Sequence, residues 1–174
     1  MRDENDEQTR LRDQRSGEAF QTVGIGAERA RHETNCLDRM VSVRHQTDLP
    51  AARIDLDGLT ETARQTGAAT VEFDVTDEAS VAAAVARACD LLDGPPDAVV
   101  CAAGIYRVEP ALDITAQGFI DVLTVNTVGS FLMAREGARA ISAGGRPGAI
   151  VLLSSMATEH GDLGEPAAHY AASK

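Results

Sequence analysis

After the first fifty residues, apolar residues recur along the chain with either the spacing of a strand or the spacing of a helix, and this pattern predicts alternating strands and helices. Residues Ala69–Phe73 alternate between apolar and polar like a half-buried strand, whereas Ala98–Ala102 and Ala149–Leu153 are continuous apolar runs typical of buried strands. Helical spacing is found over Glu78–Leu92, and a long helical stretch follows from Thr115 to about Ala143. We therefore expect strands and helices to follow one another in turn.

Turn and capping residues indicate where these elements begin and end. An earlier helix is expected over Asp57–Gln65, and Thr76 or Asp77 is placed to cap the helix that starts at Glu78. A last helix is expected to begin near Pro166. This order of elements is typical of a parallel sheet that is covered on both faces. The sequence thus predicts an α/β fold with a Rossmann-like, doubly wound parallel sheet.

The first fifty residues differ from the rest of the chain. They are mostly charged or polar, and their apolar residues have no sustained period. We therefore expect an atypical, poorly ordered segment over 1–50 and a partial dinucleotide-binding and catalytic domain over 51–174. No first strand is predicted, and a second strand is reduced at best to Ala51–Ile54.

One stretch of this segment has glycines at the spacing of a phosphate-binding loop. Gly24, Ile25 and Gly26 resemble the end of a glycine-rich loop that enters a helix, where the backbone must approach a pyrophosphate closely. The residues on either side lack the apolar period of a strand and a helix packed on a sheet. A glycine turn in an unstructured leader is the alternative interpretation.

Composition and charge exclude several classes of function. The 174 residues allow one domain of moderate size, and 44% apolar residues are enough for a core. A formal net charge of −11 argues against nucleic acid or an anionic membrane surface as a partner. No apolar run approaches membrane-spanning length. The 3 cysteines have no metal-like spacing and indicate free thiols in a reducing cytoplasm, with no metal site.

Three polar side chains near the end of the sequence form a candidate catalytic set. Ser155 follows an apolar run, and Tyr170 and Lys174, four residues apart, would share one face of a helix. A Tyr hydroxyl has a pKa of about 10, and a nearby ammonium group lowers this pKa toward neutrality. A Ser hydroxyl can hold a substrate oxygen while its charge changes. The set suits hydride transfer to or from an alcohol or ketone, provided that a dinucleotide site lies upstream.

Further motifs accompany this set in a characteristic order. These are Asp74-Val75 at the end of a strand, Cys101-Ala102-Ala103-Gly104 after the next strand, Asn126 within the long helix, Ser155, and Tyr170 with Lys174. On these motifs the chain, from about Asp57 to Lys174, resembles the short-chain dehydrogenase/reductase family. The family's Asn-Asn-Ala-Gly stretch keeps only its Ala-Gly here.

The resemblance implies an oxidoreductase that transfers a hydride between NAD or NADP and a small-molecule secondary alcohol or ketone. Tyr170 would be the general acid/base, and Lys174 would lower its pKa and bind the nicotinamide ribose. Ser155 would orient the substrate oxygen, and Asn126 would help to hold a proton-relay water. The implied cofactor-binding residues are Gly24, Ile25, Gly26, Asp74, Val75, Ala102, Ala103, Gly104, Tyr170 and Lys174. Taken alone, Asn126 reads as a helix packing residue and Asp74 as a turn residue.

Two departures from the family leave an alternative function open. The family's loop reads Thr-Gly-x-x-x-Gly-x-Gly, and Ala19-Phe20 occupy its first two positions here. Family members run to roughly 250 residues, so we expect a truncated chain that lacks the last third of the domain. The full-length form would be a homo-oligomer, a dimer or a tetramer. The alternative is a catalytically inactive fragment, or a module for nucleotide binding or dimerisation.

Overall fold

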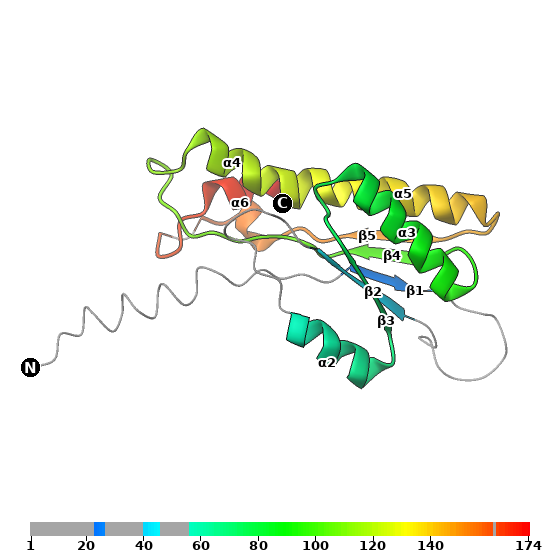
Figure 1. The fold of residues 1–174 in the computed structure, drawn as a ribbon. Helices are drawn as coiled ribbons and strands as arrows, with labels where there is room; N and C mark the ends of the chain where they lie inside the picture. Colours follow the sequence, from blue (N-terminus) through cyan, green and yellow to red (C-terminus); the bar gives the residue numbers. More distant parts are fainter. Residues whose placement is uncertain (1–22, 27–39, 46–55, 162) are drawn as a thin grey trace, which may run out of the picture.

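A sheet with helices on both faces organises the molecule (Figure 1). The computed structural model describes residues 23–26, 40–45, 56–161 and 163–174. Within these residues the sheet has five strands in the order β3-β2-β1-β4-β5. The strands are β1 Val23–Gly26, β2 Met40–His45, β3 Ala69–Phe73, β4 Ala98–Cys101 and β5 Ala149–Leu152. The doubly wound α/β fold is thus confirmed.

The direction of β1 departs from the parallel sheet that the sequence predicts. Strand β2 pairs with β3 and β4 pairs with β5 in parallel, as expected. Strand β1 lies between these two pairs and runs antiparallel to both of its neighbours, β2 and β4. An antiparallel strand can follow its neighbour without a crossover helix, so this arrangement needs no helix between β1 and β2. The sheet is therefore mixed, with its central strand reversed.

Strands β1 and β2 correct the interpretation of the first fifty residues. We expected no strand there, yet both stretches are bonded into the same sheet as the later strands. In Met40–His45, Val41 and Val43 alternate with polar residues, which is a strand signal, although a short one among charged residues. These two stretches therefore add strands to the sheet that the sequence did not predict, and the domain boundary at residue 50 stays a prediction. The strand expected at Ala51–Ile54 lies outside the described residues.

The helices match the sequence-based expectations closely. They are α2 Leu56–Thr66, α3 Glu78–Leu92, α4 Ala116–Leu123, α5 Ser130–Ala143 and α6 Ala168–Ser173, with a π-helical turn η1 at Thr124–Gly129 and a 3-10 turn η2 at Met156–Thr158. The carboxylate of Asp77 caps α3 by accepting from the N–H of Ser80 at 2.6 Å, as predicted. The long predicted helix corresponds to α4, η1 and α5. In Figure 1, α2 covers one face of the sheet, and α3 and α5 cover the other.

The core lies between the sheet and the helices α3 to α5. The largest fully buried side chains of this core are Val75, Val81, Val99, Val122, Val125 and Met133. Two glycines let the helices approach the sheet closely, because a Cβ on Gly129 would lie 2.8 Å from both methyl groups of Val75, and one on Gly137 would lie 2.9 Å from Val99. Even alanine at either position would force a neighbour to move.

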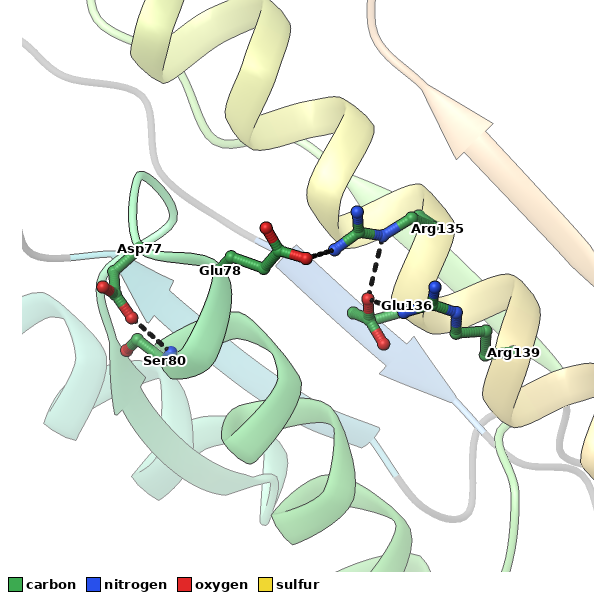
Figure 2. A network of polar contacts seen from close by, with 6 residues as sticks. All are labelled: Asp77, Glu78, Ser80, Arg135, Glu136 and Arg139. Carbon is green, nitrogen blue, oxygen red and sulfur yellow. Dashed lines mark hydrogen bonds and ion pairs between the residues drawn. The ribbon is translucent and has the colours of Figure 1, made fainter.

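An ion-pair network at the surface joins the beginning of α3 to α5 (Figure 2). Arg135 contacts Glu78 at 2.5 Å and its neighbour Glu136 at 2.9 Å, while Arg139 contacts Glu136 at 2.6 Å. These contacts lower the pKa of Glu136, with Arg139 as the largest cause, and raise the pKa of Arg135, with Glu78 as the largest cause. The network thus helps to hold α5, which directly follows η1, against the beginning of α3.

Candidate active site

Several candidate residues lie at the edge of the sheet where β3, β4 and β5 end. Because these strands run in the same direction, Asp74, the Ala102–Gly104 segment and Ser155 all follow carboxyl ends at this edge. Helix α6 lies beside α4 at the same end of the molecule (Figure 1). The topology thus gathers residues that are far apart in the sequence.

Helix α6 is held in place by the segment that follows β4. The N–H of Glu109 donates to the carbonyl of Pro166 at 2.7 Å, and Glu109 and Ala167 form an isolated parallel bridge. The ring of Tyr106, from the same segment, meets the ring of Tyr170 edge to face, with 4.8 Å between centroids. Tyr170 is therefore fixed by contacts with residues more than fifty positions earlier.

The structure brings Tyr170 and Ser155 to one cleft. The cleft has a volume of about 770 Å³, is open to solvent, and is also lined by Tyr106, Met156, Ala157, His160, Gly161 and Leu163. The Oγ of Ser155 accepts from the N–H of Ala157 at 3.2 Å, which begins the turn η2. Its hydroxyl hydrogen is not used in that bond, so it can donate to a substrate oxygen.

Lys174 lies at the end of α6, on the side of the segment after β4. A Cβ on Gly104 would lie 3.9 Å from its Nζ and 3.3 Å from Oδ1 of Asn126. Burial lowers the pKa of Lys174. The lysine is half-buried, and its carbonyl oxygen accepts from the hydroxyl of Ser154 at 3.3 Å.

Asn126 lies in the π-helical turn η1 and joins three parts of the site. Its Oδ1 accepts from the N–H of Ile105 at 2.7 Å, while its Nδ2 donates to the carbonyl of Ile105 at 3.0 Å and to Oγ of Ser173 at 2.7 Å. Only 2% of the residue is exposed, so these bonds satisfy a buried amide. The side chain is thus engaged in holding α6 and the segment after β4 against the long helix.

Two expected cofactor contacts have local roles in this structure. Oδ1 of Asp74 accepts from the N–H and the hydroxyl of Thr76 at 2.8 and 2.7 Å, which forms a turn after β3. The side chain of Val75 is fully buried in the core. Any contact of Val75 with a ligand therefore has to come from its backbone.

The stretch Gly24–Gly26, which was expected to be a phosphate loop, is part of a strand in this structure. These residues form β1, whose backbone is paired with β2 and β4 on its two sides. Gly26 is opposite Ala98, at the beginning of β4, and thus lies at the edge of the sheet away from Ser155. The physical reason is that β1 fills the gap between β2 and β4, so that the polar backbone groups of both neighbours find partners. Its N–H groups face these strands and not a phosphate.

Sequence reasoning missed His169, which directly precedes Tyr170. Its side chain is fully buried, and its Nε2 lies 3.6 Å from a carboxylate oxygen of Glu109. A buried His has no signature in the local sequence, because its partner Glu109 is far away along the chain.

Two negative findings concern the described residues alone. None of the helices in 56–161 and 163–174 is both long and apolar enough to cross a membrane. Among the residues that the structure describes, no cluster of three or more His, Cys, Asp or Glu is suited to hold a metal ion.

Comparisons with known proteins agree with the fold and the motifs. A family model described as enoyl-(acyl carrier protein) reductase matches residues 24–174. The chain is 34% identical to a sorbitol dehydrogenase of Cereibacter sphaeroides, over 69% of this chain and 47% of that protein. It is 36% identical to the uncharacterized oxidoreductase YgfF of Escherichia coli, over 77% of this chain and 54% of that protein.

A solved structure gives the same result. A short-chain dehydrogenase/reductase from Mycobacterium marinum superposes with a TM-score of 0.65 and 30% identity, covering 71% of this chain and 51% of that one. The chain thus spans about half the length of the relatives that it matches. Such proteins are oxidoreductases that use NAD or NADP. This chain belongs to the short-chain dehydrogenase/reductase family.

Proposed function

We propose that the chain carries the catalytic residues of an NAD(P)-dependent oxidoreductase acting on a secondary alcohol or ketone. The observation that carries the proposal is that Ser155 and Tyr170, from different elements, line the same open cleft. Lys174 lies four residues after Tyr170 on the same helix, and its half-buried ammonium group is close to Gly104. This is the set that proton transfer to or from a substrate oxygen requires.

Each residue of the set has a defined role in the proposal. In alcohol oxidation, the phenolate of Tyr170 accepts the proton of the substrate hydroxyl, and in ketone reduction the phenol returns it. Lys174 favours the phenolate through its positive charge, and Ser155 donates a hydrogen bond to the substrate oxygen. When bound, the nicotinamide cofactor would supply the hydride acceptor or donor. Asn126 serves by holding α6 in register, since its whole side-chain amide is already bonded.

The described residues fit one end of the cofactor better than the other. At the nicotinamide end, Lys174 and the Ala102–Gly104 segment lie together, and Gly104 leaves a space that a Cβ would occupy beside Asn126. At the pyrophosphate end, the described part of the chain has no glycine-rich loop at the carboxyl edge, because Gly24 and Gly26 are paired within β1. We assign the ribose contact to Lys174 and Tyr170, and assign no pyrophosphate contact to β1.

The substrate class rests on the cleft and on the names of relatives. A second hollow of about 260 Å³ adjoins the cleft, shares Tyr106, Ala157, His160 and Gly161 with it, and is otherwise lined mainly by small residues and Glu165. Tyr106, His160 and Glu165 are polar groups in this otherwise mainly apolar lining, and they can bind hydroxyl groups of a small molecule. Relatives carry the names sorbitol dehydrogenase and D-threitol dehydrogenase. We therefore propose a polyol or its ketone as the substrate, in the cytoplasm.

We further propose that the working form is a homo-oligomer. Apolar side chains are exposed on β5 and on the outer side of α5, including Leu152 and Phe131, both with 58% of their surface accessible. Such exposure is unusual in a monomer and is typical of surfaces that other protein segments cover.

The experiment that tests the function separates cofactor binding from turnover. NADH and NADPH are titrated against the chain by fluorescence, and oxidation of sorbitol, threitol and simple secondary alcohols is then followed at 340 nm with both cofactors. Turnover that the variant Tyr170→Phe abolishes supports the proposal. Binding without turnover favours the alternative, a nucleotide-binding module. Absence of binding as well as turnover favours the other alternative, an inactive fragment, and the reversed β1, which offers no phosphate loop, is the observation in its favour. Absence of both activities overturns the proposal for this chain.

A further inference from the structure

The side chain of His169 occupies an unusual place at the beginning of α6. It is 0% exposed and lies in the first turn of the helix that carries Tyr170. Its Nδ1 accepts from the backbone N–H of Tyr170 at 3.0 Å. The N-cap residue of α6, Ala167, supplies no side-chain cap. The first N–H groups of a helix lack partners within the helix, so His169 provides an acceptor that the usual capping residue does not.

This bond fixes the protonation state of the imidazole. Because Nδ1 accepts, a neutral ring carries its proton on Nε2. Within the described residues, Nε2 has no hydrogen-bond partner and lies 3.6 Å from Oε2 of Glu109. A proton added to Nδ1 would set a donor against the donor N–H of Tyr170. The imidazolium therefore cannot make the bond that the neutral ring makes.

The charged groups around the ring of His169 shift its pKa in opposite directions. Glu109 faces it from the segment after β4, and Arg107 of the same segment lies nearby and contacts Asp121 of α4 at 3.8 Å. Burial is the largest effect and lowers the pKa of His169, Glu109 raises it, and Arg107 lowers it. The other titratable side chains of α6 are the phenol of Tyr170 and, at its C-terminal cap, the ammonium group of Lys174.

We propose that His169 is a positioning residue for Tyr170, whose neutral imidazole holds the first turn of α6 and whose protonation releases that turn. The proposal rests on the proposed function in one respect, namely that Tyr170 is the reacting group. It adds a residue that acts on the reaction through the backbone of Tyr170, without touching substrate or cofactor.

The direction of the pH effect follows from the lowered pKa. Above the usual value for His, about 6.5, the ring is neutral in both the folded and the unfolded chain. As the pH falls below that value, the unfolded chain binds a proton before the folded chain does, and the folded state loses stability. The hold on Tyr170 is therefore complete at neutral pH and is lost in acid.

The test observes the amide of Tyr170 directly and needs no turnover. The sequence contains 2 tyrosines, so ¹⁵N-tyrosine labelling of the whole chain gives two amide signals, and the variant Tyr106→Phe assigns them. A titration from pH 8 to pH 5 is expected to shift the Tyr170 signal with a midpoint below about 6.5. At the acid end its protection against hydrogen exchange falls roughly fivefold, the loss expected for one hydrogen bond.

Two substitutions of His169 separate positioning from simple packing. In His169→Asn, the amide oxygen can take the place of Nδ1 but does not titrate, so the Tyr170 signal stays protected and no longer shifts with pH. In His169→Leu the acceptor is lost, and protection is low at every pH. A pH-dependent shift that persists in His169→Asn, or full protection in His169→Leu, overturns the proposal.

Two further variants keep the test decisive if His169→Leu does not fold. Glu109→Gln removes the negative charge that favours the imidazolium, so the midpoint of the Tyr170 shift moves to lower pH. His160→Asn replaces an exposed histidine of the cleft and leaves the midpoint unchanged. If Glu109→Gln has no effect or His160→Asn removes the shift, His169 is not the titrating group. Failure of the proposed function appears as absent turnover with this titration intact, whereas failure of the inference appears in the amide signal alone.

Discussion

Nδ2 of Asn126 donates to Oγ of Ser173 at 2.7 Å, and this bond ties the π-helical turn η1 to the helix that carries Tyr170. Ser173 passes the connection on, because its hydroxyl donates to the carbonyl of Tyr170 at 2.7 Å. The long helix and α6 are thus joined by two consecutive side-chain bonds. The partners of the first bond, Asn126 and Ser173, are 47 residues apart in the sequence. Their position relative to the cleft is therefore set by the tertiary structure.

Replacing Asn126 by Ala should destabilise the chain by about 2–4 kcal/mol, because it leaves both backbone groups of Ile105 and the Ser173 hydroxyl without this partner in a buried site. The loss of stability is measured from the shift in the midpoint of urea unfolding. Thr127→Val is the matched control, since it removes one bond to the carbonyl of Ser173 from an exposed residue and should cost less than about 1 kcal/mol. Equal losses in the two variants would contradict the role given to Asn126.

Gly129→Ala should destabilise the chain by about 1–3 kcal/mol, because the new methyl group would lie 2.8 Å from the methyl groups of Val75. The double variant with Val75→Ala removes the clash and should cost less than the sum of the two single changes. Gly161→Ala is the control, since a Cβ there meets no atom within 4 Å. Additive losses in the double variant would show that the two residues are not in contact.

Glu136→Gln should cost about 0.5–1 kcal/mol at neutral pH, the range of a partly exposed ion pair, and progressively less as the pH falls below the usual pKa of the carboxyl group. The lowered pKa of Glu136 means that its contribution to stability is present above its usual pKa and is lost as the pH falls below that value toward its pKa in the folded chain. Unfolding midpoints of the parent and the variant, measured between pH 7 and pH 3, should therefore converge. A constant difference over that range would mean that the charge of Glu136 has no part in the effect.

Most of the strands and helices after residue 56 could be predicted from the sequence, because their apolar periods agree with their caps. Strand β3 and helix α3 have the bounds that the pattern indicated, and Asp77 caps as expected. The reversed β1 could not be predicted, because the direction of a four-residue strand depends on the gap between β2 and β4 and not on its own sequence. Asn126 and Ser155 lie among the predicted elements, but which atoms they contact depends on residues distant in the chain.

Tyr170→Phe should lower kcat by about 10²–10⁴-fold, the range for loss of a general acid/base, while cofactor affinity changes little. Ser155→Ala should lower kcat by about 10²-fold through loss of a hydrogen bond to the substrate oxygen. Tyr106→Phe is the control for the cleft, because it removes only a hydroxyl that donates to Glu165 at 3.1 Å. Steady-state kinetics on one polyol measures kcat for the three variants. Unfolding midpoints measured in parallel show whether each variant is folded. Comparable loss in Tyr106→Phe would argue against Tyr170 as the reacting group.

The reversed strand β1 also bears on how the sheet comes apart. Within the described residues, the parallel pairs β2–β3 and β4–β5 bond to each other through β1, which has four residues and two glycines. Glycine is a weak strand former, so the sequence of β1 has little intrinsic preference for the extended conformation of a strand. Helix α3 contacts both β3 and α5. It therefore links the half of the sheet that contains β2 and β3 to the helix that packs on β4 and β5. The cooperativity of unfolding therefore depends on α3, and loosening that helix would let the two halves of the sheet open separately.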